Sequence, residues 1–207
     1  MRFRRSLIAC LALVFLVALP AQAVDVRHLT IAEILEAQGD GPDRKYFDFD
    51  ILAAVVGAIL AENPDSPLAA AADPDAELTV FAPNDLAFRF LAADVIDRRL
   101  LFKSEATVLA GLANTFDVAT LELVVLYHVV PGFIDSHTAL SVPRGTELDT
   151  VFGAPIRVFP KRRFRTAVLA DQDRNDANPF LVRRQLDIEA RNGILHGISL
   201  VLRPLDL

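Results

Sequence analysis

The spacing of apolar residues changes near the middle of this 207-residue chain, and that change limits the folds it can adopt. Up to about residue 126, apolar residues mostly recur every three or four positions, which is typical of amphipathic helices. Beyond it, short β-branched and apolar runs alternate with turn residues, which is typical of strands. Helices grouped in one half and strands in the other predict an α+β fold rather than alternating α/β units.

Capping residues and turn signals set the bounds of the expected elements. Thr30 with Glu33 has the pattern of a capping box, and Asn84 caps a helix that follows a short strand. Asn192-Gly193 between two apolar runs predicts a tight hairpin. The expected helices cover residues 31–37, 48–61, 85–91, 94–101, 105–112 and 117–125. The expected strands cover residues 78–81, 127–130, 147–150, 156–159, 166–170, 186–190 and 197–202. Residues 66–77 are interpreted as a loop or a weak helical turn.

The N-terminus has the three parts of a secretory signal peptide. Three arginines precede an uncharged apolar run at residues 7–19, and Ala21-Gln22-Ala23 supplies the small residues that a signal peptidase accepts. The run is shorter than the roughly 20 residues that a spanning helix needs. We therefore favour cleavage after Ala23 over an uncleaved membrane anchor. Cys10 lies too early in the apolar run for a lipoprotein cleavage site.

Removal of residues 1–23 would change the net charge and the cysteine content of the chain. The three arginines leave with this segment, which contains no acid, so the net charge goes from −6 to −9. Such an acidic chain is a poor candidate for binding nucleic acid, whose phosphates require basic partners. The only cysteine also leaves, so residues 24–207 form no disulfide and depend on their core. We find no repeat, linker or later membrane-spanning run, and expect one soluble domain in the periplasm or outside the cell.

Three blocks in the expected domain lie in a fixed order. They are TVFAPNDLAF at residues 79–88, LYHVVPG at 126–132, and RNGILHGI at 191–198 followed by VLRP at 201–204. In order and separation they resemble the two boxes and the central Tyr-His motif of the fasciclin-like domain family. The resemblance extends from about Asp25 to Pro204. It implies a compact wedge, in which a twisted β-sandwich of about seven strands is wrapped by helices, and a secreted or surface-held protein that serves adhesion.

Two residue pairs are candidate binding sites through this resemblance. Tyr127 and His128 form the central motif, which is implicated in integrin contact in some animal members. Asp187 and Ile188 match the position of an Asp-Ile pair with the same implication. The residues themselves favour a plainer interpretation. Tyr127 and His128 lie in an apolar run and are expected to be buried with their polar atoms bonded. Ile188 is expected to point inward from a strand, and Asp187 outward.

A basic and aromatic cluster at a predicted turn is the third candidate site, and it is not a usual family feature. Its members are Arg157, Lys161, Arg162, Arg163, Phe164 and Arg165. A cationic tip on an acidic protein could bind an anionic polysaccharide, lipid headgroups or an acidic partner. The alternative is a solvated hairpin end whose charge is neutralised by Asp171, Asp173 and Asp176 nearby.

The sequence contains little that indicates catalysis or metal binding. The four histidines, at positions 28, 128, 137 and 196, lack zinc-site spacing. The acidic segment from Asp171 has Asp176 and Val182 where an EF-hand loop requires Gly and Glu. A nucleophile elbow, a phosphate-binding glycine loop and a cysteine nucleophile are all missing. We therefore expect no catalytic residues, no cofactor and no metal site.

The expected function is that of an adhesion or interaction module. Its partner would be an extracellular or envelope protein, or an anionic glycan or lipid surface. The alternative is a carrier of a small apolar ligand such as a carotenoid, because some algal members of the resembling family bind pigments. A hydrolase is a third hypothesis, which a pocket gathering histidine and carboxylates would support. The sequence carries no signal for an oligomeric state.

Overall fold

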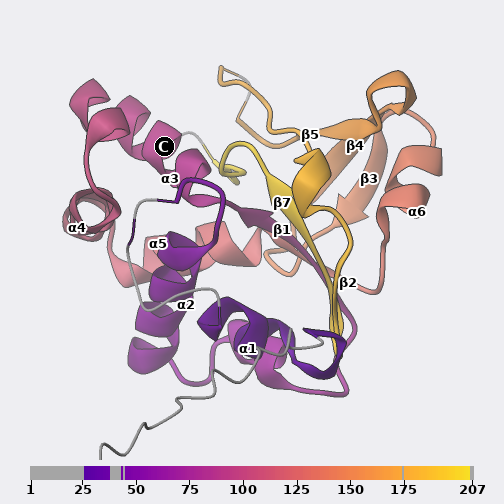
Figure 1. The fold of residues 1–207 in the computed structure, drawn as a ribbon, viewed down its shortest axis with the longest axis horizontal. Helices are drawn as coiled ribbons and strands as arrows, with labels where there is room; N and C mark the ends of the chain where they lie inside the picture. The colour runs from indigo at the N-terminus through magenta and orange to yellow at the C-terminus, as the bar shows by residue number, and fades with distance from the viewer. Residues whose placement is uncertain (1–25, 38–42, 44, 174, 206–207) are drawn as a thin grey trace, which may run out of the picture.

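The computed structural model describes residues 26–37, 43, 45–173 and 175–205. The expected signal peptide and its cleavage site lie outside the described residues. Seven strands form two sheets, and most of the helices lie to one side of them (Figure 1). The expected α+β fold is confirmed.

The first sheet has four strands in the order β2-β1-β7-β6. Its members are β1 (Leu78–Pro83), β2 (Val129–Pro131), β6 (Ile188–Ala190) and β7 (Gly193–Ile198). The central strands β1 and β7 are parallel and pair along their whole length, from Leu78 opposite Gly193 to Pro83 opposite Ile198. Both are buried throughout, as is expected of central parallel strands.

The second sheet is antiparallel, in the order β3-β4-β5. It consists of β3 (Thr146–Asp149), β4 (Pro155–Lys161) and β5 (Thr166–Ala170). Apolar residues of β4 and β5 face Phe81, Ile198 and Tyr127 in a core between the sheets. A second core lies between the first sheet and the helices. Segment 180–182 also connects the two sheets, because it hydrogen-bonds to Ala167 of β5 and to Gly197 of β7.

The helices are mostly short and have polar caps. They are η1 (Val26–His28), α1 (Ile31–Glu36), α2 (Asp50–Glu62), η2 (Pro67–Ala72), α3 (Asp85–Val95), η3 (Arg98–Phe102), α4 (Glu105–Thr115), α5 (Val118–Leu126), α6 (Ser136–Ser141), η4 (Arg162–Phe164) and η5 (Arg183–Gln185). The capping box of Thr30 and Glu33 is confirmed, with both of its hydrogen bonds present. Asn84 Oδ1 accepts a hydrogen bond from Ala87 N–H at 3.1 Å, which confirms the second expected cap.

Two expected strand bounds were wrong, and one helix was missed. The last strand covers 193–198 rather than 197–202, because pairing with β1 starts at Gly193 and ends at Ile198. The hairpin turn consequently consists of Arg191 and Asn192. The strand expected at 127–130 begins at Val129, because residues 127 and 128 close the end of α5. Helix α6 was not predicted, since its six residues are too few and too polar to show a period.

Among the described helices, none is by itself long and apolar enough to cross a bilayer. Helices α4 and α5 reach that length and composition only as a pair, and they meet at an angle of 107°.

Candidate functional site

Tyr127 and His128 lie in the interior, as the packing interpretation predicted. Tyr127 Oη donates to the Pro155 carbonyl at 3.0 Å. His128 Nδ1 donates to the Val124 carbonyl at 2.7 Å, and Nε2 accepts from Leu202 N–H at 2.9 Å. This arrangement requires the neutral imidazole with its hydrogen on Nδ1. Burial lowers the pKa of His128 to about 4. In this conformation neither side chain offers surface to a partner.

Asp187 and Ile188 lie at the start of β6 and serve different contacts. Asp187 has a positive φ of 55°, a conformation that aspartate tolerates better than most residues. Its carboxylate accepts from the backbone N–H of Ser136 at 2.7 Å and from the Ser136 hydroxyl at 2.5 Å. Its N–H donates to His196 Nδ1 at 3.2 Å. Ile188 packs against the helical core. Asp187 thus holds the first turn of α6 against the first sheet.

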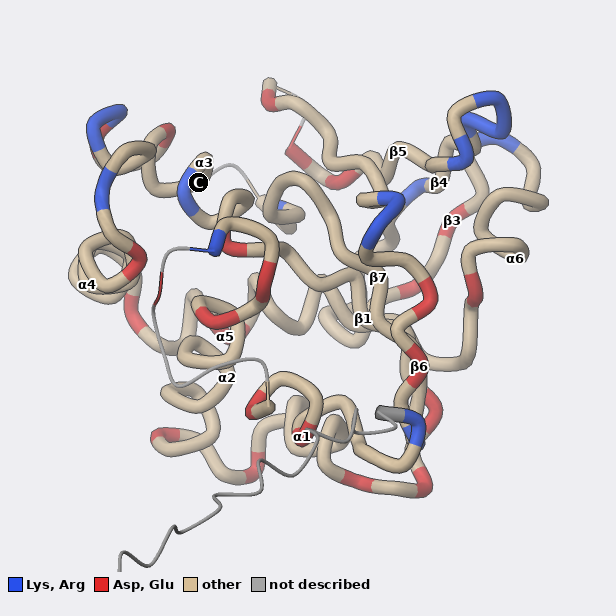
Figure 2. Tube along the Cα trace, in the orientation of Figure 1, with Lys and Arg blue, Asp and Glu red and all other residues tan. Residues whose placement is uncertain are grey.

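The basic and aromatic cluster of residues 157 and 161–165, which we call the basic tip, lies where η4 connects β4 to β5. Lysines and arginines gather there (Figure 2). Arg157 and Lys161 are partly buried on β4, whereas residues 162–165 are exposed. Arg162 has a structural role, because its guanidinium donates to the carbonyls of Leu140 and Ser141 at 2.9 and 3.0 Å. These bonds hold the end of α6 on the tip. Arg163 and Phe164 make no such contact and remain available at the surface.

Arg163 and Phe164 border a groove that sequence reasoning did not find. The groove has a volume of about 490 Å³, and it is also lined by Phe180, Arg183 and Arg184. Thr166 Oγ1 donates to the Leu181 carbonyl, and Val168 pairs with Phe180, so segment 180–182 follows the edge of β5. We call the surface of Arg163, Phe164, Phe180, Arg183 and Arg184 the basic groove. The adjacent pair of arginines in the sequence was the one signal that could have indicated it.

The arginines of the basic groove have no carboxylate partner among the described residues. The acids expected to neutralise the tip pair elsewhere. Asp173 and Asp176 form ion pairs with Arg203, and Asp171 accepts the backbone N–H of Arg203 at 3.0 Å. The alternative interpretation of a neutralised hairpin end is therefore not supported by these contacts.

An apolar groove of about 470 Å³ adjoins the basic groove and shares Phe180 with it. Besides Phe180, its carbon-rich walls include Phe47, Leu86, Phe90 and Leu200. Phe47 is 62% exposed and Phe180 is 50% exposed, high values for phenylalanine. We call this surface the apolar groove. An apolar ligand would find mainly carbon on its walls.

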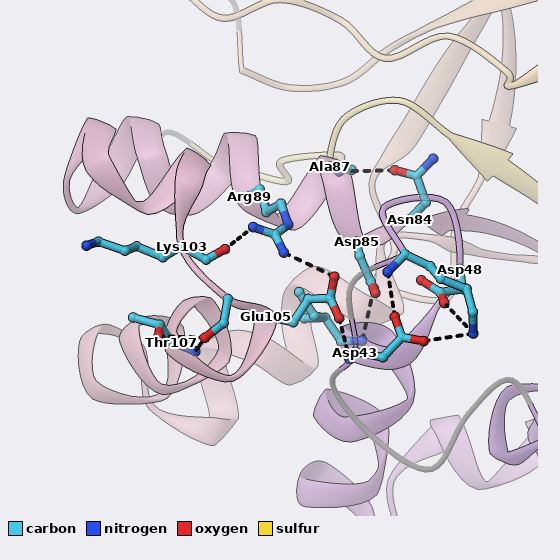
Figure 3. Close-up of polar contacts among 12 residues, drawn as sticks. Asp43, Asp48, Asn84, Asp85, Ala87, Arg89, Lys103, Glu105 and Thr107 are labelled. Carbon is cyan, nitrogen blue, oxygen red and sulfur yellow. Dashed lines mark hydrogen bonds and ion pairs between the residues drawn. The ribbon is translucent and has the colours of Figure 1, made fainter.

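A buried group of carboxylates lies beneath the start of three helices (Figure 3). Asp50, Asp85 and Glu105 are the first residues of α2, α3 and α4. One oxygen from each lies within 4.8 Å of the others. Burial raises the pKa of Asp85 to about 8, a rise that the hydrogen bond from Ile51 N–H opposes and the Asp48 carboxyl reinforces. Burial, followed by the charge of Asp48, also raises the pKa of Asp50.

Arg89 supplies the buried positive charge beside these acids. Its Nη2 lies 3.1 Å from Glu105 Oε1, and its Nη1 donates to the Lys103 carbonyl. The guanidinium also lies 4.6 Å from the ring centroid of Tyr46. Sequence reasoning missed this group, because its members come from three helix starts that are far apart in the chain.

Comparisons with known proteins agree on one family. The model of the Fasciclin domain matches residues 58–204. A solved structure of a FAS1 domain pair, from the insect cell adhesion molecule fasciclin I, is similar with a TM-score of 0.57 and 14% sequence identity. The match covers 86% of this chain and 52% of that one, so the chain spans about half of the domain pair. At this identity the similarity concerns the fold. No curated protein matches the chain.

Proposed function

The chain belongs to the fasciclin domain family, and from that premise we propose that it is an adhesion or envelope-interaction module that binds an anionic polysaccharide in its basic groove. Fasciclin domains often serve cell adhesion and are generally not enzymes. They are typically extracellular, and we propose that cleavage after Ala23 exports this one.

The observation that carries the proposal is the set of unpaired charges in the basic groove. Arg163, Arg183 and Arg184 are exposed, face a common hollow, and have no ion-pair partner among the described residues. They do so on a chain whose net charge is −6. A local positive patch on an acidic protein attracts anions while the remainder of the surface repels them.

The side chains of the groove suit a charged sugar polymer. The planar guanidinium of arginine binds carboxylate or sulfate groups through two parallel hydrogen bonds. Phe164 and Phe180 are 65% and 50% exposed and line the same groove as these arginines. A sugar ring has an apolar face and polar edges, so it can contact the phenylalanines while its acidic substituents reach the arginines.

The proposal is tested by retention of the mature protein on beads that carry a sulfated or carboxylated polysaccharide. The test variant replaces Arg163, Arg183 and Arg184 with serine, and should be lost from the beads at moderate salt. Arg162 is left intact because it holds α6. Binding of the wild type, but not of the variant, to anionic lipid vesicles, with no binding of either to the beads, would instead assign the groove to a membrane surface and contradict the proposal.

A second candidate function follows from the apolar groove. The exposed Phe47, Phe90 and Phe180 could hold a small apolar ligand, as in a carotenoid carrier. The absorbance spectrum of protein purified from its native source decides this directly. A visible absorbance band that is lost in a Phe47→Ser, Phe90→Ser variant supports the carrier, and a colourless native protein contradicts it.

A further inference from the structure

The buried acids below α2, α3 and α4 are more than a group of capping residues. The acidic cluster consists of Asp43, Asp48, Asp50, Asp85 and Glu105. Figure 3 shows Asp43, Asp48, Asp85 and Glu105 close together, with Asp85 and Glu105 pointing toward one another, and Asp50 lies within reach of Asp85 and Glu105. Asp50 and Asp85 are 4% and 0% exposed, and Glu105 is 0% exposed.

Two cations contact the cluster among the residues that the structure describes. Lys45 contacts Asp43 at 2.7 Å and Asp48 at 3.8 Å, and Arg89 contacts Glu105 at 3.1 Å. Each helix start adds the equivalent of about half a positive charge. Among the described residues, Arg89 is thus the one cation in ion-pair contact with Asp50, Asp85 or Glu105.

Four buried oxygens of the cluster also lack any hydrogen-bond donor among the described residues. They are both carboxylate oxygens of Asp48, Oδ2 of Asp50 and Oδ2 of Asp85. The second oxygen of Asp85 accepts from Ile51 N–H at 3.0 Å, so this side chain is oriented by the backbone with its other oxygen toward the cluster. A buried carboxylate oxygen without a donor is unfavourable by several kcal/mol unless a proton or a cation meets it.

We propose that Asp50, Asp85 and Glu105 bind one calcium ion. The three carboxylates supply hard oxygen ligands, which calcium and magnesium prefer over nitrogen or sulfur. Calcium accepts six to eight oxygens at about 2.3–2.6 Å in a flexible geometry, whereas magnesium requires a near-ideal octahedron and usually keeps several waters. The three oxygens lie within 4.8 Å of one another and belong to buried side chains, which suits the less demanding calcium ion. Water would complete the coordination on the side of residues 43 and 48.

The ion would link three helix starts that otherwise repel one another. Asp50, Asp85 and Glu105 belong to α2, α3 and α4, so a shared ion would fix the relative positions of these helices. Ile51 N–H and the Arg89 guanidinium already orient two of the ligands, which lowers the ordering required on binding.

The test is thermal unfolding of the mature protein at neutral pH, in chelator and in a calcium series. Asp85→Asn is the main variant, because asparagine keeps the oxygen that accepts from Ile51 N–H and loses the charge. Asp50→Asn is the second variant, and the exposed Asp65→Asn is the matched control. We expect calcium at 100 times its Kd to raise Tm by about 5–10 °C in the wild type and in Asp65→Asn, and to leave both cluster variants unchanged.

Terbium gives a readout that does not depend on stability. The chain has two tyrosines and no tryptophan, and Tyr46 lies against Arg89 beside the cluster. Tyrosine-sensitised terbium emission should appear in the wild type, decrease on addition of calcium, and be lost in Asp85→Asn. Absence of a calcium shift in the wild type would overturn the proposal and assign the cluster to protons. An equal calcium shift in Asp85→Asn would overturn it by placing the ion elsewhere.

Discussion

His128 accepts a hydrogen bond at its Nε2 from the backbone N–H of Leu202, 2.9 Å away and 74 residues later in the chain. Its Nδ1 meanwhile donates to Val124. The imidazole therefore bonds the end of α5 to the segment that follows β7, and it can do so only when neutral. A second proton would direct an N–H at the N–H of Leu202.

We predict that acid weakens the fold through His128. Its pKa is lowered from 6.5 to about 4 in the folded protein, so the unfolded chain binds the proton more strongly. Neutral His128 therefore contributes about 3 kcal/mol to the free energy of unfolding above about pH 6.5. This contribution is lost as the pH falls toward 4. Urea unfolding between pH 4 and 7 measures the slope of the free energy of unfolding against pH.

His128→Gln should flatten that slope, and the exposed His137→Gln should leave it unchanged. Burial also lowers the pKa of His196. His196 should therefore contribute part of the pH dependence of the free energy of unfolding in every variant. A His128→Gln curve parallel to the wild-type curve would show that His128 does not couple folding to pH.

Asn192 is predicted to be one of the most sensitive polar residues. Its Oδ1 accepts from Ile31 N–H at 2.8 Å, and its Nδ2 donates to the carbonyls of Ala71 and Asp73 at 2.9 and 2.8 Å. Asn192→Ala leaves these groups without partners, which should lower the free energy of unfolding by about 3 kcal/mol. Asn192→Asp should be at least as harmful at pH 7, because its carboxylate would face carbonyl oxygens. A loss below 1 kcal/mol in both would contradict this role.

Gly193 is predicted to tolerate no side chain. A Cβ at this position would lie 2.0 Å from the Leu78 carbonyl oxygen, where β7 and β1 begin to pair. Gly193→Ala should therefore lower the free energy of unfolding by about 3 kcal/mol or more, or prevent folding. Gly57 in α2 is the matched control, since its Cβ would meet nothing within 4 Å. Gly57→Ala should stabilise the protein by about 0.5–1 kcal/mol. Equal effects at the two glycines would contradict the close approach of the strands.

Local signals predicted most elements of this fold, and long-range pairing accounts for the errors. Caps such as Asn84 and β-branched runs such as residues 78–81 act within a few positions, so they are readable from sequence. The bounds of β7 depend on its parallel partner more than one hundred residues earlier in the chain. Asn192 was expected in the turn, but its bonds to residues 31, 71 and 73 could not be deduced from spacing.

The candidate sites were predicted less completely, for a related reason. The exposed tip at Arg163 and Phe164 was expected, whereas Arg183 and Arg184 reach it only because segment 180–182 follows β5. The sequence motifs of zinc and EF-hand sites did not reveal the acidic cluster, because they require ligands that are closely spaced in the chain. Its carboxylates meet because three helix starts converge, a relationship that depends on packing.

The affinity of the mature protein for a soluble anionic polysaccharide tests the central claim most directly. The two variants to compare each remove three exposed positive charges. One replaces Arg163, Arg183 and Arg184 in the basic groove, and the other replaces Arg98, Arg99 and Lys103 around η3. We predict that the groove variant binds about 10–100 times more weakly than the wild type, and that the η3 variant binds within about threefold of it. Equal losses in the two variants, or no binding by the wild type at low salt, would contradict the account.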